Sequence, residues 1–297
     1  DYCTDETNAS PAIAVNPVWI LDQYITWDRV LTREYDGEPS VAYGKEGELF
    51  ITTDGRWLEC IDTEDASVST IENISGNAPI NAPDQLLFTG EDIFSYNVDD
   101  AAYARFNRQR RQWEGVGDFT PESHYWNKAS AWWEDEKALV SFGGYGFYHY
   151  NNELMIQYPY SDKEDVKITL DGIHPRYSAA TAILGDILYI FGGRGNPSGK
   201  QELSPRKYYD LYTVDLRTYK LTRLWEFDED PEFEFVPSGN MVYDKDRKCF
   251  YVFTTLEGGT LISISPEKQG FELMSLPVTF LGNAQYSFFT LWMGKDG

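Results

Sequence analysis

The chain has 297 residues, of which 42% are hydrophobic and 16% are aromatic, and this composition argues against an intrinsically disordered protein. It carries 48 acidic and 25 basic residues, a formal net charge of −23, so its surface repels the phosphates that dominate nucleic-acid affinity. No apolar run reaches the roughly 18 residues of a membrane-spanning helix, and we expect no membrane insertion by this segment.

The start of the chain, its cysteines and its charge indicate where the protein works. Residues 1–16 are polar, small and Pro-containing and predict a flexible lead-in, and the sequence begins at Asp1, which predicts a trimmed segment of a longer protein. Cys3, Cys60 and Cys249 stand far apart and form neither a disulfide framework nor a zinc-binding spacing. The acidity favours an extracytoplasmic location, in the periplasm or at the cell surface. We expect no metal and no cofactor.

Residues 17–36 have a mixed pattern that predicts about two strands, and a repeated unit begins after them. Each unit contains an inner and an outer predicted hairpin, and the units cover about residues 38–76, 79–120, 124–171, 174–228 and 236–277. One apolar or aromatic position of the outer hairpin recurs at steps of 45, 54, 54 and 50 residues, at Ile61, Phe106, near Tyr160, Val214 and Ile264. A period of this size is typical of a propeller blade.

The fourth unit shows the pattern in full. Residues 178–184 and 187–191 flank Gly185-Asp186, which is a two-residue turn signal between strand-like runs. Gly192-Gly193 ends the second run, and the outer hairpin follows after a polar excursion at residues 196–209. Four antiparallel strands in about 50 residues make up one propeller blade.

This unit resembles a kelch repeat. The resemblance lies in Pro175-Arg176 before the first strand, in Phe191-Gly192-Gly193 at the end of the second, and in Val214-Asp215 followed seven residues after Val214 by Leu221. A second diglycine, Gly143-Gly144, ends the corresponding strand of the third unit. Glycine is needed where inner strands crowd toward a propeller axis and φ turns positive. The resemblance implies an all-β, kelch-like β-propeller with four-stranded antiparallel blades.

The two ends of the chain are predicted to complete the ring. Residues 282–297 look like the first strand of a further unit, and residues 17–36 supply strands that lack an inner hairpin of their own. A propeller removes its exposed sheet edges when strands from both ends share one blade. We therefore expect six blades, five internal and one shared, in a single domain at residues 17–297.

Known catalytic signatures are not matched. Galactose oxidase-like kelch enzymes need a copper site of two His, two Tyr and a Cys crosslinked to a Tyr, whereas the histidines here are His124, His149 and His174 and no Cys stands in a matching context. The chain has no nucleophile elbow, zinc-protease motif or phosphate-binding loop. A kelch-type sugar mutarotase needs only a carboxylate and a cation in the central mouth, so a sugar-processing enzyme of that kind stays the alternative.

Recognition by loops is the remaining function. In propellers, the loops that enter the innermost strands and those that link the middle strands surround the mouth of the central channel. Aromatic faces there suit sugar rings or aromatic partners and an arginine suits a carboxylate, although the same rings also serve as packing between blades. The predicted mouth residues are His124, Tyr125, Trp126, Lys128, Tyr145, Arg176, Tyr177 and Arg194.

The excursion at residues 196–209 is the one insertion that exceeds what a hairpin needs. It is basic and aromatic on an acidic chain, and long loops are often functional, although a clasp between blades is an equal alternative. Its candidate residues are Lys200, Arg206, Lys207 and Tyr208. The sequence thus predicts a non-catalytic binding or sensing module, the ectodomain of a larger protein, which recognises a carbohydrate-like ligand or a protein partner through its loops.

Overall fold

The computed structural model describes residues 24–27, 31–36, 39–44, 47–53, 55–73, 85–89, 92–97, 102–116, 126–228, 234–278 and 291. In these residues the protein is all-β, and its longer strands form five four-stranded antiparallel sheets, each from one stretch of chain. The predicted all-β class and the predicted four-stranded sheets are therefore confirmed. No helix in the described part is long and apolar enough to cross a membrane. The predicted single domain stays a prediction.

The first two sheets have their strands paired in chain order. The first sheet consists of β1 (Ser40–Tyr43), β2 (Glu48–Thr52), β3 (Trp57–Asp62) and β4 (Val68–Glu72). The second consists of β5 (Gln85–Phe88), β6 (Ile93–Asn97), β7 (Ala102–Asn107) and β8 (Gln112–Val116).

The other three sheets repeat this order in their long strands. The third consists of β9 (Ala129–Trp133), β10 (Ala138–Phe142), β13 (Glu153–Gln157) and β14 (Val166–Thr169). The fourth consists of β16 (Ala180–Leu184), β17 (Ile187–Phe191), β20 (Asp210–Asp215) and β21 (Lys220–Glu226). The fifth consists of β22 (Pro237–Asp244), β23 (Cys249–Thr254), β24 (Thr260–Ile264) and β25 (Phe271–Leu273), with the short 3-10 helix η2 (Leu256–Gly258) after β23.

The seven-residue spacing in the sequence has a simple structural cause. Val214 and Leu221 lie directly opposite each other in the outer hairpin of the fourth sheet. The equivalent residues are direct partners in three more sheets, in the pairs Ile61 and Val68, Phe106 and Trp113, and Ile264 and Phe271. Because directly opposed residues share one face of a sheet, each pair packs its two side chains together.

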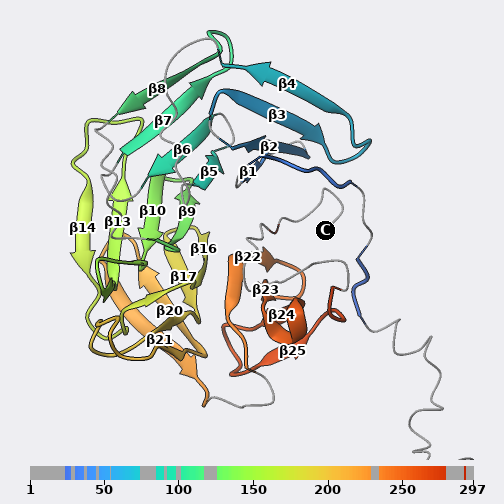
Figure 1. The fold of residues 1–297 in the computed structure, drawn as a ribbon. Helices are drawn as coiled ribbons and strands as arrows, with labels where there is room; N and C mark the ends of the chain where they lie inside the picture. Colours follow the sequence, from blue (N-terminus) through green and yellow to red (C-terminus); the bar gives the residue numbers. More distant parts are fainter. Residues whose placement is uncertain are drawn as a thin grey trace, which may run out of the picture.

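Figure 1 shows the five sheets side by side around a common centre, with β1, β5, β9, β16 and β22 innermost. Neighbouring innermost strands are in contact: β1 contacts β5, and β16 contacts both β9 and β22. Apolar clusters fill the spaces between successive sheets, because side chains alternate between the two faces of each strand. Each sheet is therefore packed against its neighbours as a propeller blade would be.

The N-terminal segment contacts the fifth sheet. Ile25 forms a parallel bridge with Ser275, and its N–H donates to the carbonyl of Met274 at 2.7 Å. The ring of Trp27 meets that of Phe253 edge-on, with centroids 5.9 Å apart. These contacts cover the face of the fifth sheet that is turned away from the fourth.

The same segment then reaches the first sheet. Arg33 and Tyr35 both donate hydrogen bonds to the buried carboxylate of Glu59 in β3, and Tyr35 stacks on Trp57 at 5.7 Å. Of the residues 17–36 that were expected to supply strands, 24–27 and 31–36 are described and hold an isolated bridge, and the others lie outside the described part.

The C-terminal residue that the structure describes also contacts the fifth sheet. Leu291 exchanges two hydrogen bonds with the side-chain amide of Asn240 in β22, at 2.8 and 2.9 Å. Its side chain packs against the apolar cluster of Tyr251, Phe253, Leu261 and Val278. The rest of residues 282–297 lies outside the described part, so the shared sixth blade stays a prediction.

Candidate ligand-binding site

A second layer of short strands lies over the third and fourth sheets. These strands belong to the links between the sheets' long strands and to the link from the third sheet to the fourth. They are β11 (Tyr145–Gly146), β12 (His149–Tyr150), β15 (Arg176–Tyr177), β18 (Arg194–Gly195) and β19 (Arg206–Lys207).

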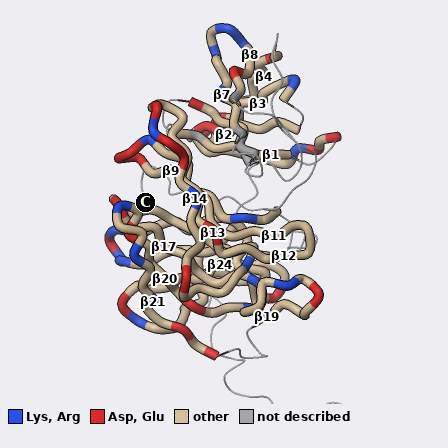
Figure 2. The backbone as a smooth tube through the Cα atoms, turned by 90° about the vertical axis from the view of Figure 1, so that its left-hand side faces the viewer, with Lys and Arg blue, Asp and Glu red and all other residues tan. Residues whose placement is uncertain are grey.

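This layer occupies one side of the molecule. In the side view of Figure 2, β11, β12 and β19 all lie toward the right, on the side that faces the viewer in Figure 1. We call residues 126–128, 143–152, 170–179 and 192–209 the loop face. We call the turns at the other ends of the same sheets, at residues 134–137, 185–186 and 216–219, the turn face. The sequence did not predict the short strands, because each has only two residues.

Glycines allow the layer to approach the sheets closely. Gly143 has φ of +72°, and a Cβ atom there would lie 2.5 Å from the carbonyl oxygen of Arg176. The next amide, of Gly144, donates to that oxygen at 2.8 Å. A Cβ atom on Gly195 would lie 1.9 Å from the carbonyl oxygen of Pro175. The diglycine positions are therefore explained by positive φ together with backbone contact.

Four aromatic rings form a continuous cluster on the loop face. Trp126 bridges to Tyr145 through the backbone and meets its ring edge-on at 5.6 Å. Tyr177 lies 4.8 Å from Tyr145 and stacks on Tyr150 at 5.5 Å, with the planes 17° apart. Trp126 is 41% exposed, Tyr145 and Tyr177 are half-buried, and Tyr150 is buried. Three of the predicted mouth residues are thus brought together on the surface.

Two tyrosines of this cluster, Tyr145 and Tyr150, are uncharged at neutral pH. Burial raises the pKa of Tyr145 and of Tyr150 above the usual value near 10, and the neighbouring tyrosine Tyr177 adds to the rise. Their hydroxyl groups therefore stay protonated, can donate or accept hydrogen bonds, and do not act as bases.

An arginine stands directly beside the aromatic cluster. Tyr177 of β15 pairs with Arg194 of β18, which pairs in turn with Lys207 of β19. Direct partners in antiparallel strands share one face, so these three side chains form a row. Lys207 is ion-paired with Glu234 at 2.5 Å, and this contact lowers the pKa of the Glu234 carboxyl. The half-buried Arg194 is thus the cation closest in register to the rings.

A hairpin tip with two aromatic residues projects from the same face. Phe147 and Tyr148 connect β11 to β12 with φ of +45° and +66°, a left-handed conformation that bulky residues rarely adopt. They are 44% and 75% exposed. The carbonyl of Tyr148 accepts from the amide of Gln201, and the amide of Tyr150 donates to the carbonyl of Gly199. The insertion at residues 196–209 therefore holds the tip in place.

Arg176 belongs to the scaffold of the site. Its side chain is fully buried and pairs with Asp210 through two contacts of 2.5 and 3.0 Å. It also donates to the carbonyls of His174 and Gly192 and lies 4.0 Å from the ring centre of Tyr208. Its donors point into the protein, so we assign it a structural role.

The other insertion residues differ from one another in exposure. Tyr208 is buried, which raises its pKa, and packs beside His174 at 5.6 Å. Arg206 is exposed, lies 4.9 Å from the Tyr208 ring centre, and comes within 3.4 Å of a ring nitrogen of His174. Burial lowers the pKa of His174, and the nearby Arg206 and Arg176 lower it further. Lys200 is exposed beside the hairpin tip.

Some predicted residues lie elsewhere, and some site residues were not predicted. His124 and Tyr125 lie outside the described residues, and Lys128 is buried. The residues missed are Tyr150, Phe147, Tyr148 and Asp210. The sequence signal for the first three is the run from residue 145 to 150, where four of six residues are aromatic.

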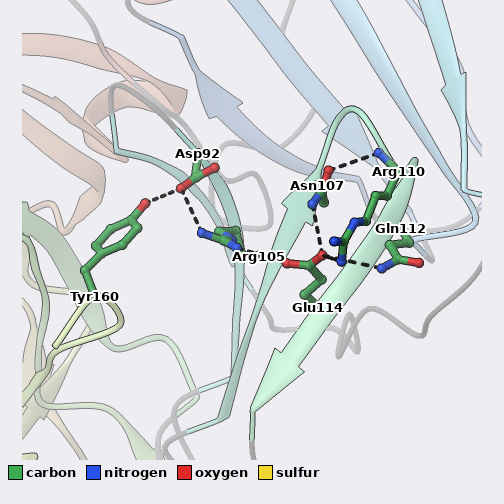
Figure 3. Close-up of polar contacts among 7 residues, drawn as sticks. All are labelled: Asp92, Arg105, Asn107, Arg110, Gln112, Glu114 and Tyr160. Carbon is green, nitrogen blue, oxygen red and sulfur yellow. Dashed lines mark hydrogen bonds and ion pairs between the residues drawn. The ribbon is translucent and has the colours of Figure 1, made fainter. Parts of the chain in front are cut away.

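A separate polar network joins the second and third sheets (Figure 3). Arg105 of β7 donates to Glu114 of β8 at 2.9 Å and approaches Asp92, which accepts a hydrogen bond from Tyr160. The contact with Arg105, helped by Asn107, lowers the pKa of Glu114 to about 2. A carboxyl group held charged in this way cannot serve as a general acid near neutral pH. This network links the second sheet to the third through the contact of Tyr160 with Asp92.

In the part of the chain that the structure describes, no cluster of His, Cys, Asp and Glu has metal-binding geometry. Cys60 and Cys249 are free thiols, and burial raises the pKa of both. In comparisons with known proteins, no protein-family model and no curated protein matches the chain.

Proposed function

We propose that this chain is a non-catalytic binding module, a six-bladed kelch-like β-propeller whose loop face recognises a carbohydrate-like ligand. The observation that carries the proposal is the cluster of Trp126, Tyr145 and Tyr177, three rings that touch one another and reach solvent. Protein interiors normally hide rings of this size, so a surface cluster fixed by backbone pairing favours a binding role.

Stacking is the contact that these rings offer. One face of a sugar ring presents C–H groups that pack against an aromatic ring, while its hydroxyl groups point sideways. The hydroxyls of Tyr145 and Tyr177 provide neutral donors and acceptors beside the rings. Backbone pairs hold Trp126 to Tyr145 and Gly144 to Arg176, so little conformational entropy is lost when a ligand binds.

The contacts at the ends of the chain support the sixth blade. Ile25 and Trp27 pack on the fifth sheet, Arg33 and Tyr35 bond to the first, and Leu291 bonds to β22 of the fifth. Segments from both termini therefore lie at the two sheets that have a described neighbour on one side only. A shared blade would fill this position and leave no free sheet edge.

Location and context are part of the same proposal. The net charge of −23 supports work outside the cytoplasm, and the module would serve as the ectodomain of a larger sensor or receptor. Its partner is a carbohydrate-like small molecule, or a protein that presents one on its surface.

The test is calorimetry against a panel of neutral and acidic mono- and oligosaccharides. Trp126→Ala and Tyr177→Ala should each weaken binding by about tenfold, the effect of losing about 1.4 kcal/mol of stacking. Tyr219→Ala is the matched control, because Tyr219 is an exposed tyrosine on the turn face, and it should bind like the unaltered chain.

Three results would contradict the proposal. If neither Trp126→Ala nor Tyr177→Ala changes the affinity, the ligand does not bind at the aromatic cluster. A failure of every saccharide to bind would exclude this ligand class. Interconversion of sugar anomers, followed by NMR and lost on changing one mouth carboxylate, would replace the binding module with a mutarotase-type enzyme.

A further inference from the structure

The loop face has the opposite charge balance from the whole chain. Its four segments contain four basic residues besides the buried Lys128 and Arg176, and two acidic residues, Asp171 and Glu202. One of the four, Lys207, is paired with Glu234 from outside the segments. Over the complete sequence, acidic residues outnumber basic ones by 48 to 25. A local excess of positive charge on so acidic a protein attracts an anionic ligand to this face.

The cations of this face also differ in their pairing from those elsewhere. Within the described ranges, the side chains of Arg194, Lys200 and Arg206 have no carboxylate within ion-pair distance. Among the arginines that do pair are Arg33, Arg105, Arg110, Arg111, Arg217, Arg223 and Arg247. Carboxylates are in excess in this chain, so an arginine side chain normally lies near one. An arginine without an ion pair is therefore positioned by the fold at a distance from carboxylates.

Glu234 is a carboxylate that contacts the row of Tyr177, Arg194 and Lys207 at its Lys207 end. It pairs with Lys207 at 2.5 Å, and Arg194 contributes a smaller effect to its lowered pKa. The carboxylate of Glu234 therefore faces two cations, Lys207 and Arg194, and these three side chains together keep one positive charge. Arg194 is also the only one of the unpaired cations that shares a strand-register row with a ring of the aromatic cluster.

The register fixes what can bind here. Tyr177 and Arg194 are direct cross-strand partners, so their Cβ atoms lie about 5 Å apart on one face. A sugar ring stacked on Tyr177 and Tyr145 would carry a substituent at its rim, beside the guanidinium. The planar fork of arginine matches a carboxylate, with two parallel N–H donors for two oxygens.

We propose that the ligand of the loop face is an acidic saccharide, whose ring stacks on Tyr177 and Tyr145 and whose carboxylate pairs with Arg194. This inference rests on the proposed function and narrows its ligand class. One unpaired cation beside a rigid aromatic surface fits the single carboxylate of a uronic or sialic acid residue. An acidic peptide is the other anionic ligand that the test must separate.

The test compares ligands that differ in charge alone. Tri-galacturonate, a hyaluronan tetrasaccharide and sialyllactose are each titrated beside their methyl esters, which keep the rings and remove the charge, and beside hexaglutamate. We expect at least one acid to bind tenfold or more tightly than its ester, and its affinity to fall as salt rises.

Variants assign the effect to the residue. Arg194→Gln should remove the preference for the acid over its ester, and Arg194→Lys should keep part of it, because a lysine retains the charge without the fork. Lys220→Gln makes the same charge change at an exposed residue of β21, whose side chain is not on the loop face, and should leave the preference unchanged.

Each outcome decides between the claims. If esters and acids bind equally and Arg194→Gln has no effect, the inference is wrong while the proposed function stands. If no saccharide binds, both are wrong, and binding of hexaglutamate would then assign the face to an acidic peptide. If the acid is preferred but Arg194→Gln keeps the preference, the carboxylate site lies elsewhere.

Discussion

The two ends of the third and fourth sheets use charge in opposite ways. On the turn face, Arg217 donates to Glu136 at 2.6 Å and to Asp186 at 2.7 Å, and so joins the third sheet to the fourth. On the loop face, Arg194 stands beside Tyr177 with no such pair among the described residues. Charges that satisfy each other hold the sheets together, whereas charges left without a partner are available to a ligand.

The buried pair of Arg176 and Asp210 is the exception on the loop face. It lies in the same layer as Arg194 but is paired and hydrogen-bonded as fully as any contact of the turn face. Burial and ion pairing therefore distinguish a structural arginine such as Arg176 from a candidate binding arginine such as Arg194. Lying on the loop face is not sufficient for a binding role.

The largest expected effect comes from this buried pair. Arg176→Ala leaves the carboxylate of Asp210 buried without a partner and should lower the free energy of unfolding by about 3–5 kcal/mol. Arg194→Ala should change it by no more than about 0.5 kcal/mol, as surface substitutions do. Urea denaturation of both variants measures the difference. Equal losses of stability would break the distinction between scaffold and binding arginines.

Substitutions at two glycines, one on each face, should change stability by an intermediate amount. Gly143 on the loop face and Gly185 on the turn face both have positive φ, +72° and +58°. A Cβ atom meets a backbone oxygen at 2.5 Å in the first case and nothing within 4 Å in the second. Gly185→Ala should cost about 1–2 kcal/mol from φ alone, and Gly143→Ala distinctly more. Similar denaturation midpoints would show that the two layers are not closely packed.

The smallest expected effect is a pH dependence of stability, which should differ between the loop face and the turn face. The pKa of His174 is lowered, so its contribution to stability is complete above about pH 6.5 and is lost as the pH falls below that value. The pKa values of Glu136 on the turn face and of Asp215, the residue of β20 directly before the turn at residues 216–219, are also lowered, from 4.5 and 3.8. The contribution of these two carboxyl groups to stability is therefore lost only below about pH 4.5.

Melting temperatures between pH 7 and pH 3 test this separation. The first decline should vanish in His174→Gln, and the second should remain. A single decline below pH 4.5 in the unaltered chain would mean that burial and the nearby arginines do not lower the pKa of His174.

Much of the fold could be predicted from the sequence. The bounds of β17 are those expected for the run at residues 187–191. The outer hairpin of the third unit was expected near Tyr160, but β13 ends at Gln157. Tyr160 turns toward Asp92 of the second sheet instead, a contact made 68 residues away that local pattern does not encode.

The candidate site could be predicted in part. Their place before an innermost strand indicated Trp126 and Tyr177, and their place directly after a diglycine indicated Tyr145 and Arg194. The sequence could not separate Arg176 from Arg194, because burial by Asp210 depends on a pairing 34 residues away. It also gave no sign of positive φ at Phe147 and Tyr148, since bulky side chains normally avoid this conformation.

The bridge between Ile25 and Ser275 has a consequence for how the protein is made. Its two halves lie about 250 residues apart, so a ribosome releases the first long before it completes the second. The sheets between them pack by contacts close in sequence and need not wait. Ile25 must wait for Ser275 to emerge, whereas Arg33 and Tyr35 of the same segment can bond to Glu59 much earlier. The bridge is thus among the last of these contacts to form, although its first half is synthesised before all five sheets.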